Sequence, residues 1–157
     1  MSKQFKSNKN NHKKSIIPEL LQFLASTYSV YLKSQNFHWN VTGSNFLTLH
    51  SFFQKQYEEL ATAVDDIAER IRALDTISPG SYAEFAKLSQ IKDSIGKKSA
   101  SKMISELLDN HLSMIHLIRE LISTTKECQD DATQDLLIRR LNAHEKTIWI
   151  LKSLKFK

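Results

Sequence analysis

Two histidines and two carboxylates are the residues in this sequence whose types and spacing could bind a metal ion. His38 and His50 stand twelve residues apart, on either side of Gly43. Asp65 and Glu69 follow at the i and i+4 spacing that puts two side chains on one face of a helix. Imidazole and carboxylate groups together suit first-row transition metals, including Fe(II), better than magnesium or calcium. Paired acids are also common on an ordinary solvated helix face, so the spacing alone leaves both interpretations open.

The elements that must position these residues are helices. The chain of 157 residues has only three Gly and two Pro, and residues that favour helices fill the intervals between them. Apolar residues recur at helical spacing, best of all after Gly43. The stripe in that segment consists of Phe53, Tyr57, Leu60, Val64, Ile67, Ile71 and Leu74.

The breaks between these stripes predict four long helices and a short one. Their expected ranges are 18–42, beginning at Pro18, then 46–75, 81–89, 101–126 and 131–154. Ser81 and Glu84 have the spacing of a capping box at the start of the short helix. The predicted fold class is therefore all-α, a four-helix bundle with a short extra helix in the long connection between its second and third helices.

The helical geometry separates the histidines from the carboxylates within one chain. A hairpin that turns near Gly43 brings His38 back beside His50. Asp65, fifteen residues beyond His50, lies roughly 22 Å further along the helix, and its face points away from the bundle. Two such helices paired antiparallel about a twofold axis would place the histidines of one chain against the carboxylates of the other. The prediction is two symmetric metal sites at a dimer interface, with an ordinary polar dimer contact as the alternative.

The net charge of +5 belongs entirely to the N-terminal residues. Residues 1–17 hold no acid and five lysines, so 17 basic residues remain against 17 acidic ones in 18–157. The lysines are Lys3, Lys6, Lys9, Lys13 and Lys14. A stretch this polar buries too little surface to fold, which predicts a flexible arm at 1–17 and one helical domain at 18–157. The arm could bind DNA phosphates or simply favour solubility.

The single cysteine, Cys128, excludes a disulfide within the chain, and no apolar run resembles a signal peptide or a membrane span. We therefore expect a soluble cytoplasmic protein that does not enter the membrane. His111 and His144 stand on or beside apolar stripes and are expected to be hydrogen-bonded packing residues.

Three segments, "NFHWNVTGSNFLTLH", "DDIAERIRAL" and "AHEKTIWIL", closely resemble the Dps family, the DNA-binding proteins of starved cells. The resemblance runs from about Ile17 to Leu151 and implies a ferritin-like bundle that assembles as a homododecamer. It further implies an iron-binding ferroxidase site between twofold-related subunits, with His38, His50, Asp65 and Glu69 as ligands. The implied activity is oxidation of Fe(II), preferably by hydrogen peroxide, with storage of ferric mineral.

The resemblance also implies a role in oxidative stress, in which the protein binds DNA without sequence preference and associates with the nucleoid. Asp131 and Asp135 resemble the acids that line the family's threefold pore, although acids are also favourable at a helix N-terminus. One departure is Gln54, where the family usually has Asp or Glu, and a neutral amide is a poorer iron ligand. Two hypotheses follow: a ferroxidase shell weakened at its second iron position, or a nucleoid-compacting DNA-binding protein that has lost most of its ferroxidase activity.

Overall fold

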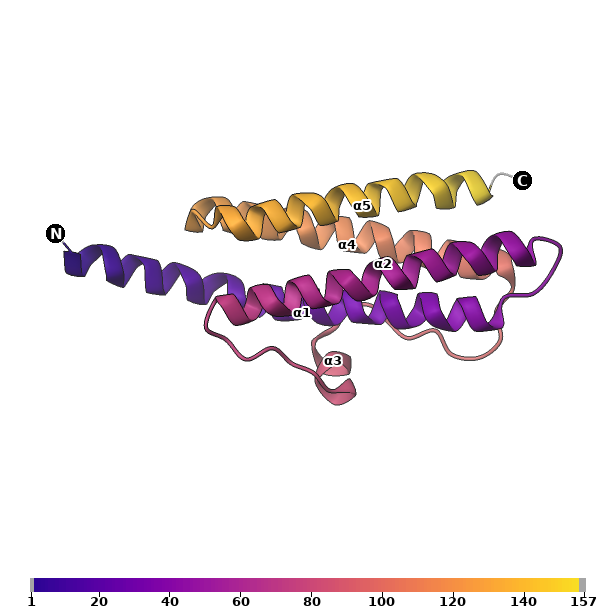
Figure 1. The fold of residues 1–157 in the computed structure, drawn as a ribbon, viewed down its shortest axis with the longest axis horizontal. Helices are drawn as coiled ribbons and strands as arrows, with labels where there is room; N and C mark the ends of the chain where they lie inside the picture. Colours follow the sequence, from indigo (N-terminus) through magenta and orange to yellow (C-terminus); the bar gives the residue numbers. More distant parts are fainter. Residues whose placement is uncertain (1, 156–157) are drawn as a thin grey trace.

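The protein is an all-α bundle of four long helices with one short helix outside it (Figure 1). A computed structural model describes the backbone of residues 2–155 and the side chains of residues 16–155. The helices are α1 (Ser2–Asn40), α2 (Phe46–Ala73), α3 (Tyr82–Leu88), α4 (Ala100–Cys128) and α5 (Asp131–Lys155). No strand occurs within these described ranges. The predicted fold class and the extra helix between α2 and α4 are both confirmed.

The first helix begins earlier than the pattern predicted. It starts at Ser2, and Pro18, expected in its first turn, lies inside it. No Gly or Pro interrupts residues 2–17, so nothing in that stretch stops a helix that continues into the bundle. The side chains of residues 1–15 lie outside the described part of the chain. The flexible arm and the DNA contacts of its five lysines therefore stay predictions.

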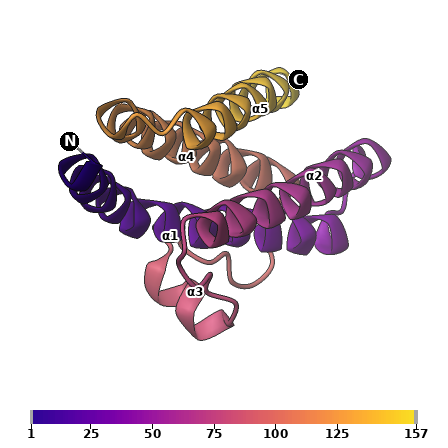
Figure 2. The same ribbon diagram turned by 60° about the vertical axis from the view of Figure 1, so that its left-hand side comes forward.

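Two helical hairpins make up the bundle (Figure 2). α1 packs along α2, α4 packs along α5, and α1 and α4 join the two pairs. The shared core is mostly apolar, as the stripes predicted. Its largest fully buried side chains include Phe23, Phe37, Phe53, Leu60, Ile67, Ile71, Met103, Leu107 and Met114.

The short helix α3 lies against the outer side of α1. Phe85 is its buried residue, and its ring stacks on Tyr28 with centroids 4.4 Å apart. The predicted capping box is present, because the Ser81 hydroxyl accepts from the Glu84 amide while the Glu84 carboxylate accepts from the Ser81 amide. Across the described residues, no helix has an apolar stretch long enough to cross a membrane.

Candidate metal centre

A tight turn between α1 and α2 positions the two histidines. Gly43 has a φ of 112°, a left-handed conformation that glycine adopts without steric cost. Its carbonyl accepts a 3.0 Å hydrogen bond from the amide of Phe46, the first residue of α2. The chain therefore reverses within a few residues, and the last turn of α1 lies beside the first turns of α2.

His38 and His50 are in direct contact across this turn, as the hairpin geometry predicted. The Nδ1 atom of His38 lies 2.9 Å from the backbone oxygen of His50, and the Nδ1 atom of His50 lies 2.9 Å from the backbone oxygen of His38. The two rings stack with centroids 3.8 Å apart and planes 19° from parallel. Both side chains are half-buried.

These reciprocal hydrogen bonds decide which nitrogen of each ring carries the proton. A backbone carbonyl only accepts, so each Nδ1 must be the protonated donor. The lone pair of each neutral ring is then on Nε2, which is the arrangement usual for histidines that bind metals through Nε2. The turn thus presents two imidazole donors with their tautomers already set.

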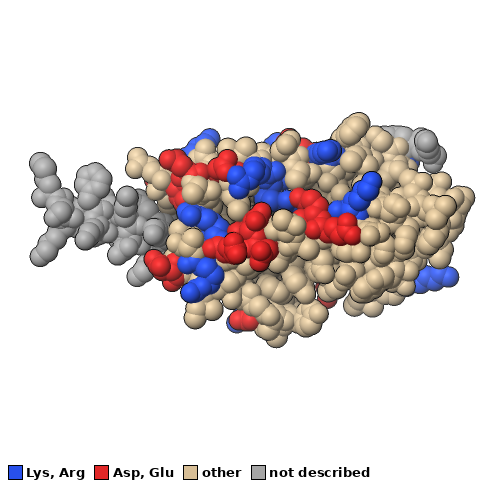
Figure 3. Space-filling view, viewed as in Figure 1, with Lys and Arg blue, Asp and Glu red and all other residues tan. Residues whose placement is uncertain are grey.

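Aromatic side chains contact both histidine rings, and exposed apolar side chains lie at the same end of the hairpin. Phe46 stacks on His50 at 5.0 Å, and Tyr57 meets His38 edge-on at 5.3 Å. Trp39 and Leu47, at the same end of the hairpin, are 64% and 77% exposed. Figure 3 shows the charged side chains of one face gathered over its middle and one end, whereas the end with the α1–α2 turn is mostly uncharged.

The carboxylates of Asp65 and Glu69 lie elsewhere on α2 and are both exposed. Within residues 16–155 neither forms an ion pair or a side-chain hydrogen bond. No three His, Cys, Asp or Glu side chains in the described part of the chain come close enough to hold one metal ion. One chain therefore supplies two imidazoles at one end of α2 and two unpartnered carboxylates towards the other.

Gln54 lies one turn beyond His50 on the exposed side of α2. Its Nε2 donates a 2.8 Å hydrogen bond to Glu58 Oε1. A carboxylate only accepts, so the amide must present its NH2 group to Glu58 and leave its own Oε1 free. The only group that Gln54 can offer a cation is this neutral oxygen.

The two acids predicted for the pore are exposed at the start of α5, and Asp135 forms an ion pair with Arg139 on the same helix. Asp131 is the first residue of α5. The preceding residue, Asp130, caps the helix by accepting from the Thr133 amide at 3.1 Å, and it also binds Arg70 at 2.7 Å. The favourable placement of acids at a helix N-terminus is present, while the pore role stays a prediction.

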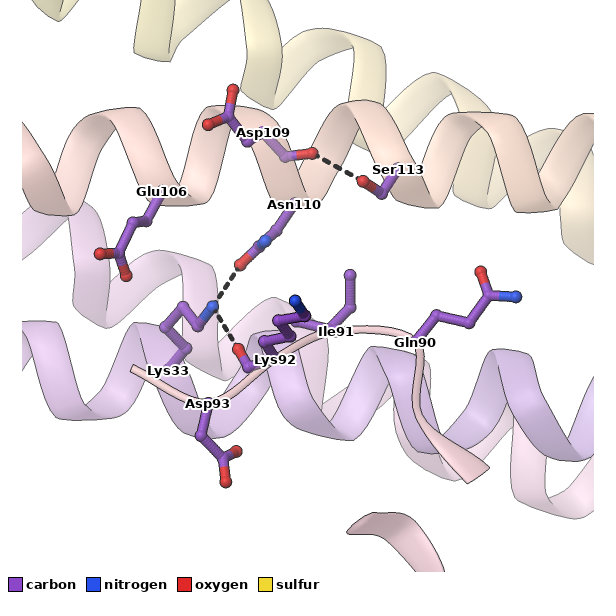
Figure 4. Close-up of a pocket in the computed structure, with 9 residues that line it drawn as sticks. All are labelled: Lys33, Gln90, Ile91, Lys92, Asp93, Glu106, Asp109, Asn110 and Ser113. Carbon is purple, nitrogen blue, oxygen red and sulfur yellow. Dashed lines mark hydrogen bonds between the residues drawn. The ribbon is translucent and has the colours of Figure 1, made fainter. Parts of the chain in front are cut away.

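A polar pocket of about 290 Å³ lies away from the histidines, between α1, α4 and the connection that follows α3 (Figure 4). Lys33 is buried beside it, and burial lowers the pKa of this lysine. Its Nζ donates to the backbone oxygen of Lys92 at 2.8 Å and to Asn110 Oδ1 at 2.7 Å. Lys33 thereby ties the long connection to α1 and α4. The sequence pattern alone did not single out this lysine, although it stands among the core positions Val30 and Phe37.

Comparison with known proteins places the chain among ferritin-like proteins. The family model for ferritin-like domains matches residues 17–155. The chain is 31% identical to a DNA protection during starvation protein of Brevibacillus brevis over 130 residues, which cover 83% of this chain and 87% of that protein. The structure of Dps from Thermosynechococcus elongatus superposes with a TM-score of 0.91 at 28% identity, covering 95% of each chain. A Dps protein of Vibrio cholerae O1, described as a member of a superfamily of ferritin-like diiron-carboxylate proteins, superposes with a TM-score of 0.89 at 26% identity, covering 92% and 91%.

Proposed function

This chain belongs to the ferritin-like family as a Dps protein, and we propose that it forms an iron-storage shell that oxidises Fe(II) and protects DNA. One observation carries the proposal. The paired histidines with free Nε2 atoms and the unpartnered carboxylates lie at separate places on the exposed side of one helix hairpin. Each half is suited to iron, and each is incomplete without the other.

A twofold-related subunit would complete the site. If two α2 helices pair antiparallel, His38 and His50 of one subunit face the carboxylates of Asp65 and Glu69 in the other, and the reverse holds at the second site. The exposed Trp39 and Leu47 beside the histidines favour this arrangement, because a covering subunit would remove their apolar surface from water. We place these paired sites at the twofold interfaces of a homododecamer.

The ligand set fits the oxidation of Fe(II). The carboxylates stabilise the added positive charge of Fe(III), while neutral imidazoles bind the divalent ion without repelling it. Hydrogen peroxide accepts two electrons, so two Fe(II) ions that give one each reduce it with two protons to two water molecules, and no hydroxyl radical is released. The ferric product would then be stored as mineral inside the shell. Asp131 and Asp135 would concentrate Fe(II) at a threefold pore, with Arg139 offsetting part of their charge.

Gln54 weakens this chemistry at the second iron position. Its amide oxygen carries no net charge, so the iron nearest His50 gains less stabilisation on oxidation than the iron held by His38, Asp65 and Glu69. This observation also favours a second candidate function. In that alternative the protein compacts the nucleoid as a DNA-binding shell, and its ferroxidase activity is weak or lost.

DNA binding would depend on the N-terminal arm. The lysines of this segment are Lys3, Lys6, Lys9, Lys13 and Lys14. Each contact with a phosphate releases counterions and carries no base information, so the binding would not depend on sequence. Twelve arms on one shell would add weak contacts into strong overall binding. This would place the protein on the nucleoid in the cytoplasm.

Titration of the assembled protein with Fe(II) without oxygen, followed by hydrogen peroxide, tests the proposal. We expect saturable binding and ferric formation much faster than in buffer alone. His38→Ala and Asp65→Ala should each abolish the rapid phase, whereas His116→Ala, which changes an exposed histidine of α4, should not. Oxidation no faster than free iron, in a shell that still condenses DNA, would support the second candidate instead.

A further inference from the structure

A buried histidine pair in the bundle core takes no part in the proposed metal sites. His111 of α4 and His144 of α5 are each 1% exposed, and their Nδ1 atoms lie 2.7 Å apart, which confirms that both are hydrogen-bonded packing residues. Burial lowers the pKa of His111 to about 3, with the positive charge of Arg140 as a second cause. Burial also lowers the pKa of His144 well below its usual value. Both rings are therefore neutral at pH 7.

Two neutral rings joined through Nδ1 must be different tautomers. One ring donates its Nδ1–H and keeps a bare lone pair on Nε2. The other ring accepts at Nδ1, so its proton is on Nε2. Among the described residues, no group hydrogen-bonds to the Nε2 of His111 or of His144. The pair thus presents one unpaired donor and one unpaired acceptor inside the core.

Arg140 and Gln56 supply the complementary unpaired groups. The guanidinium of Arg140 binds the Glu59 carboxylate with both terminal nitrogens, but its buried Nε–H has no partner in the described part of the chain. Gln56 Oε1 is likewise buried and unpaired there. The four unpaired atoms thus comprise two donors and two acceptors.

The contacts between α2 and α5 place Gln56 at the level of the histidine pair. Glu59 of α2 binds Arg140 of α5, whereas Arg70, further along α2, binds Asp130, which precedes α5. The two helices therefore run antiparallel.

Gln56 lies three residues before Glu59, so it is level with the residues three to four beyond Arg140, a stretch that includes His144. It also stands between the buried Phe53 and Leu60, on the core side of α2.

We propose that these residues form an internal water-binding site in the core of each subunit. Ordered water would accept from Arg140 Nε–H and from one histidine Nε2–H, and would donate to the other Nε2 and to Gln56 Oε1. The set of Gln56, Glu59, His111, Arg140 and His144 is called the polar layer below. One water molecule can make up to four such bonds, and buried water in proteins typically makes about three.

The energetics favour water over an unfilled layer. A buried polar group without a partner destabilises the folded state, so four together would be a large loss for one domain. Proteins hold roughly one buried water per 27 residues, or about six in a chain of this length, which makes such a site ordinary in number.

The polar layer would also align the two hairpins. α2 and α5 approach each other closely at few positions, and the Glu59–Arg140 ion pair is one of them. A hydrogen-bonded network that spans α2, α4 and α5 fixes the position of one hairpin relative to the other along the helix axes. Apolar contacts alone would tolerate several such positions. Glu59 and Arg140 side chains are 45% and 9% exposed, so the network reaches the surface at Glu59.

A crystal structure of the assembled full-length protein at about 1.5 Å resolution tests the inference. We expect ordered water within about 2.6–3.2 Å of both Nε2 atoms, and bridges from it to Arg140 Nε and Gln56 Oε1. Water at only one Nε2, or at neither, would overturn the proposal.

The direction in which one substitution changes the Tm gives a second test. If water bridges the layer, Gln56→Met removes an acceptor and should lower the Tm by about 3 °C or more. If the layer is dry, the same change deletes an unpaired buried amide oxygen and should raise the Tm, which would overturn the proposal. Lys55→Met, on the exposed side of α2, controls for the effect of methionine on this helix and should leave the Tm nearly unchanged.

Discussion

His38 and His50 exchange hydrogen bonds, each ring donating its Nδ1–H to the backbone carbonyl of the other residue at 2.9 Å. The acceptors belong to the backbone, so replacing one side chain leaves the tautomer of the other unchanged. Each histidine can therefore be tested separately as a ligand.

His38→Ala and His50→Ala should each weaken binding of a redox-inert probe, Co(II), to the assembled protein. We expect the affinity to fall by at least about 10- to 100-fold. A loss of that size follows even when only a residue that hydrogen-bonds to a metal ligand is replaced. The free energy of unfolding should fall by only about 1 kcal/mol, the net value of one hydrogen bond. Calorimetric titration measures the affinity, and His116→Ala is the matched control. Unchanged Co(II) affinity in both variants would show that the histidines do not bind the metal.

Gln54→Glu should strengthen the second iron position. A carboxylate at residue 54 adds a charged oxygen donor one turn from His50, and about tenfold tighter binding of the second ion corresponds to roughly 1.4 kcal/mol. Glu58 would then face a like charge at i+4, so the unbound variant should be slightly less stable and regain stability on binding. Titration to saturation measures both ions. Equal affinity and stoichiometry in the two proteins would show that residue 54 does not contact metal.

The buried histidine pair should make the fold sensitive to mild acid. The unfolded chain takes up protons on His111 and His144 as the pH falls through about 6.5, whereas burial keeps the pKa of His111 at about 3 in the folded state. Their contribution to stability is therefore complete above about pH 6.5, and it is lost progressively as the pH falls below that value. Each histidine adds a slope of about 1.4 kcal/mol per pH unit.

Urea unfolding between pH 7 and pH 5 measures this slope. The double variant His111→Leu/His144→Leu should lose most of it, because carboxylates titrate mainly below this window. An unchanged slope in the double variant would assign the acid sensitivity to other groups.

Deletion of residues 1–14 should remove most of the affinity for DNA. Five lysines that each contact a phosphate contribute a slope of up to about 4.5 in log K against log salt, and the truncated protein should lose that dependence. Binding to a duplex at several salt concentrations measures it. Co(II) binding should stay at the full-length value, which separates the two activities. Equal DNA affinity with and without these residues would contradict the role of the arm.

Much of the fold could be predicted because local periodicity determines it. The ends of α2, α4 and α5 lie within two residues of their predicted positions. Clear apolar stripes are interrupted at Gly43, at residues 76–80 (TISPG) and at residues 126–131 (KECQDD). The contact between His38 and His50 could be predicted from the hairpin that turns near Gly43. The start of α1 could not be predicted in this way, because a polar segment without Gly or Pro has no marked stop.

The buried polar residues were harder to predict because their partners come from distant helices. Lys33 stands at a buried position of α1, and Gln56 lies between the buried Phe53 and Leu60 of α2, which was the available signal. Nothing in local spacing shows that Lys33 reaches Asn110 or that Arg140 reaches Glu59. Such pairs depend on the register between helices far apart in the sequence.

Mixing two inactive variants tests the shared interface site most directly. One variant carries His38→Ala and His50→Ala, the other Asp65→Ala and Glu69→Ala, and each alone should lack rapid Fe(II) oxidation. The two variants are refolded together in equal amounts. Random mixing makes about half of the twofold pairs mixed, and each mixed pair has one intact site of two. The mixture should therefore recover about a quarter of the wild-type sites and of the rapid phase. No recovery in assemblies shown to contain both variants would contradict a site built from two subunits.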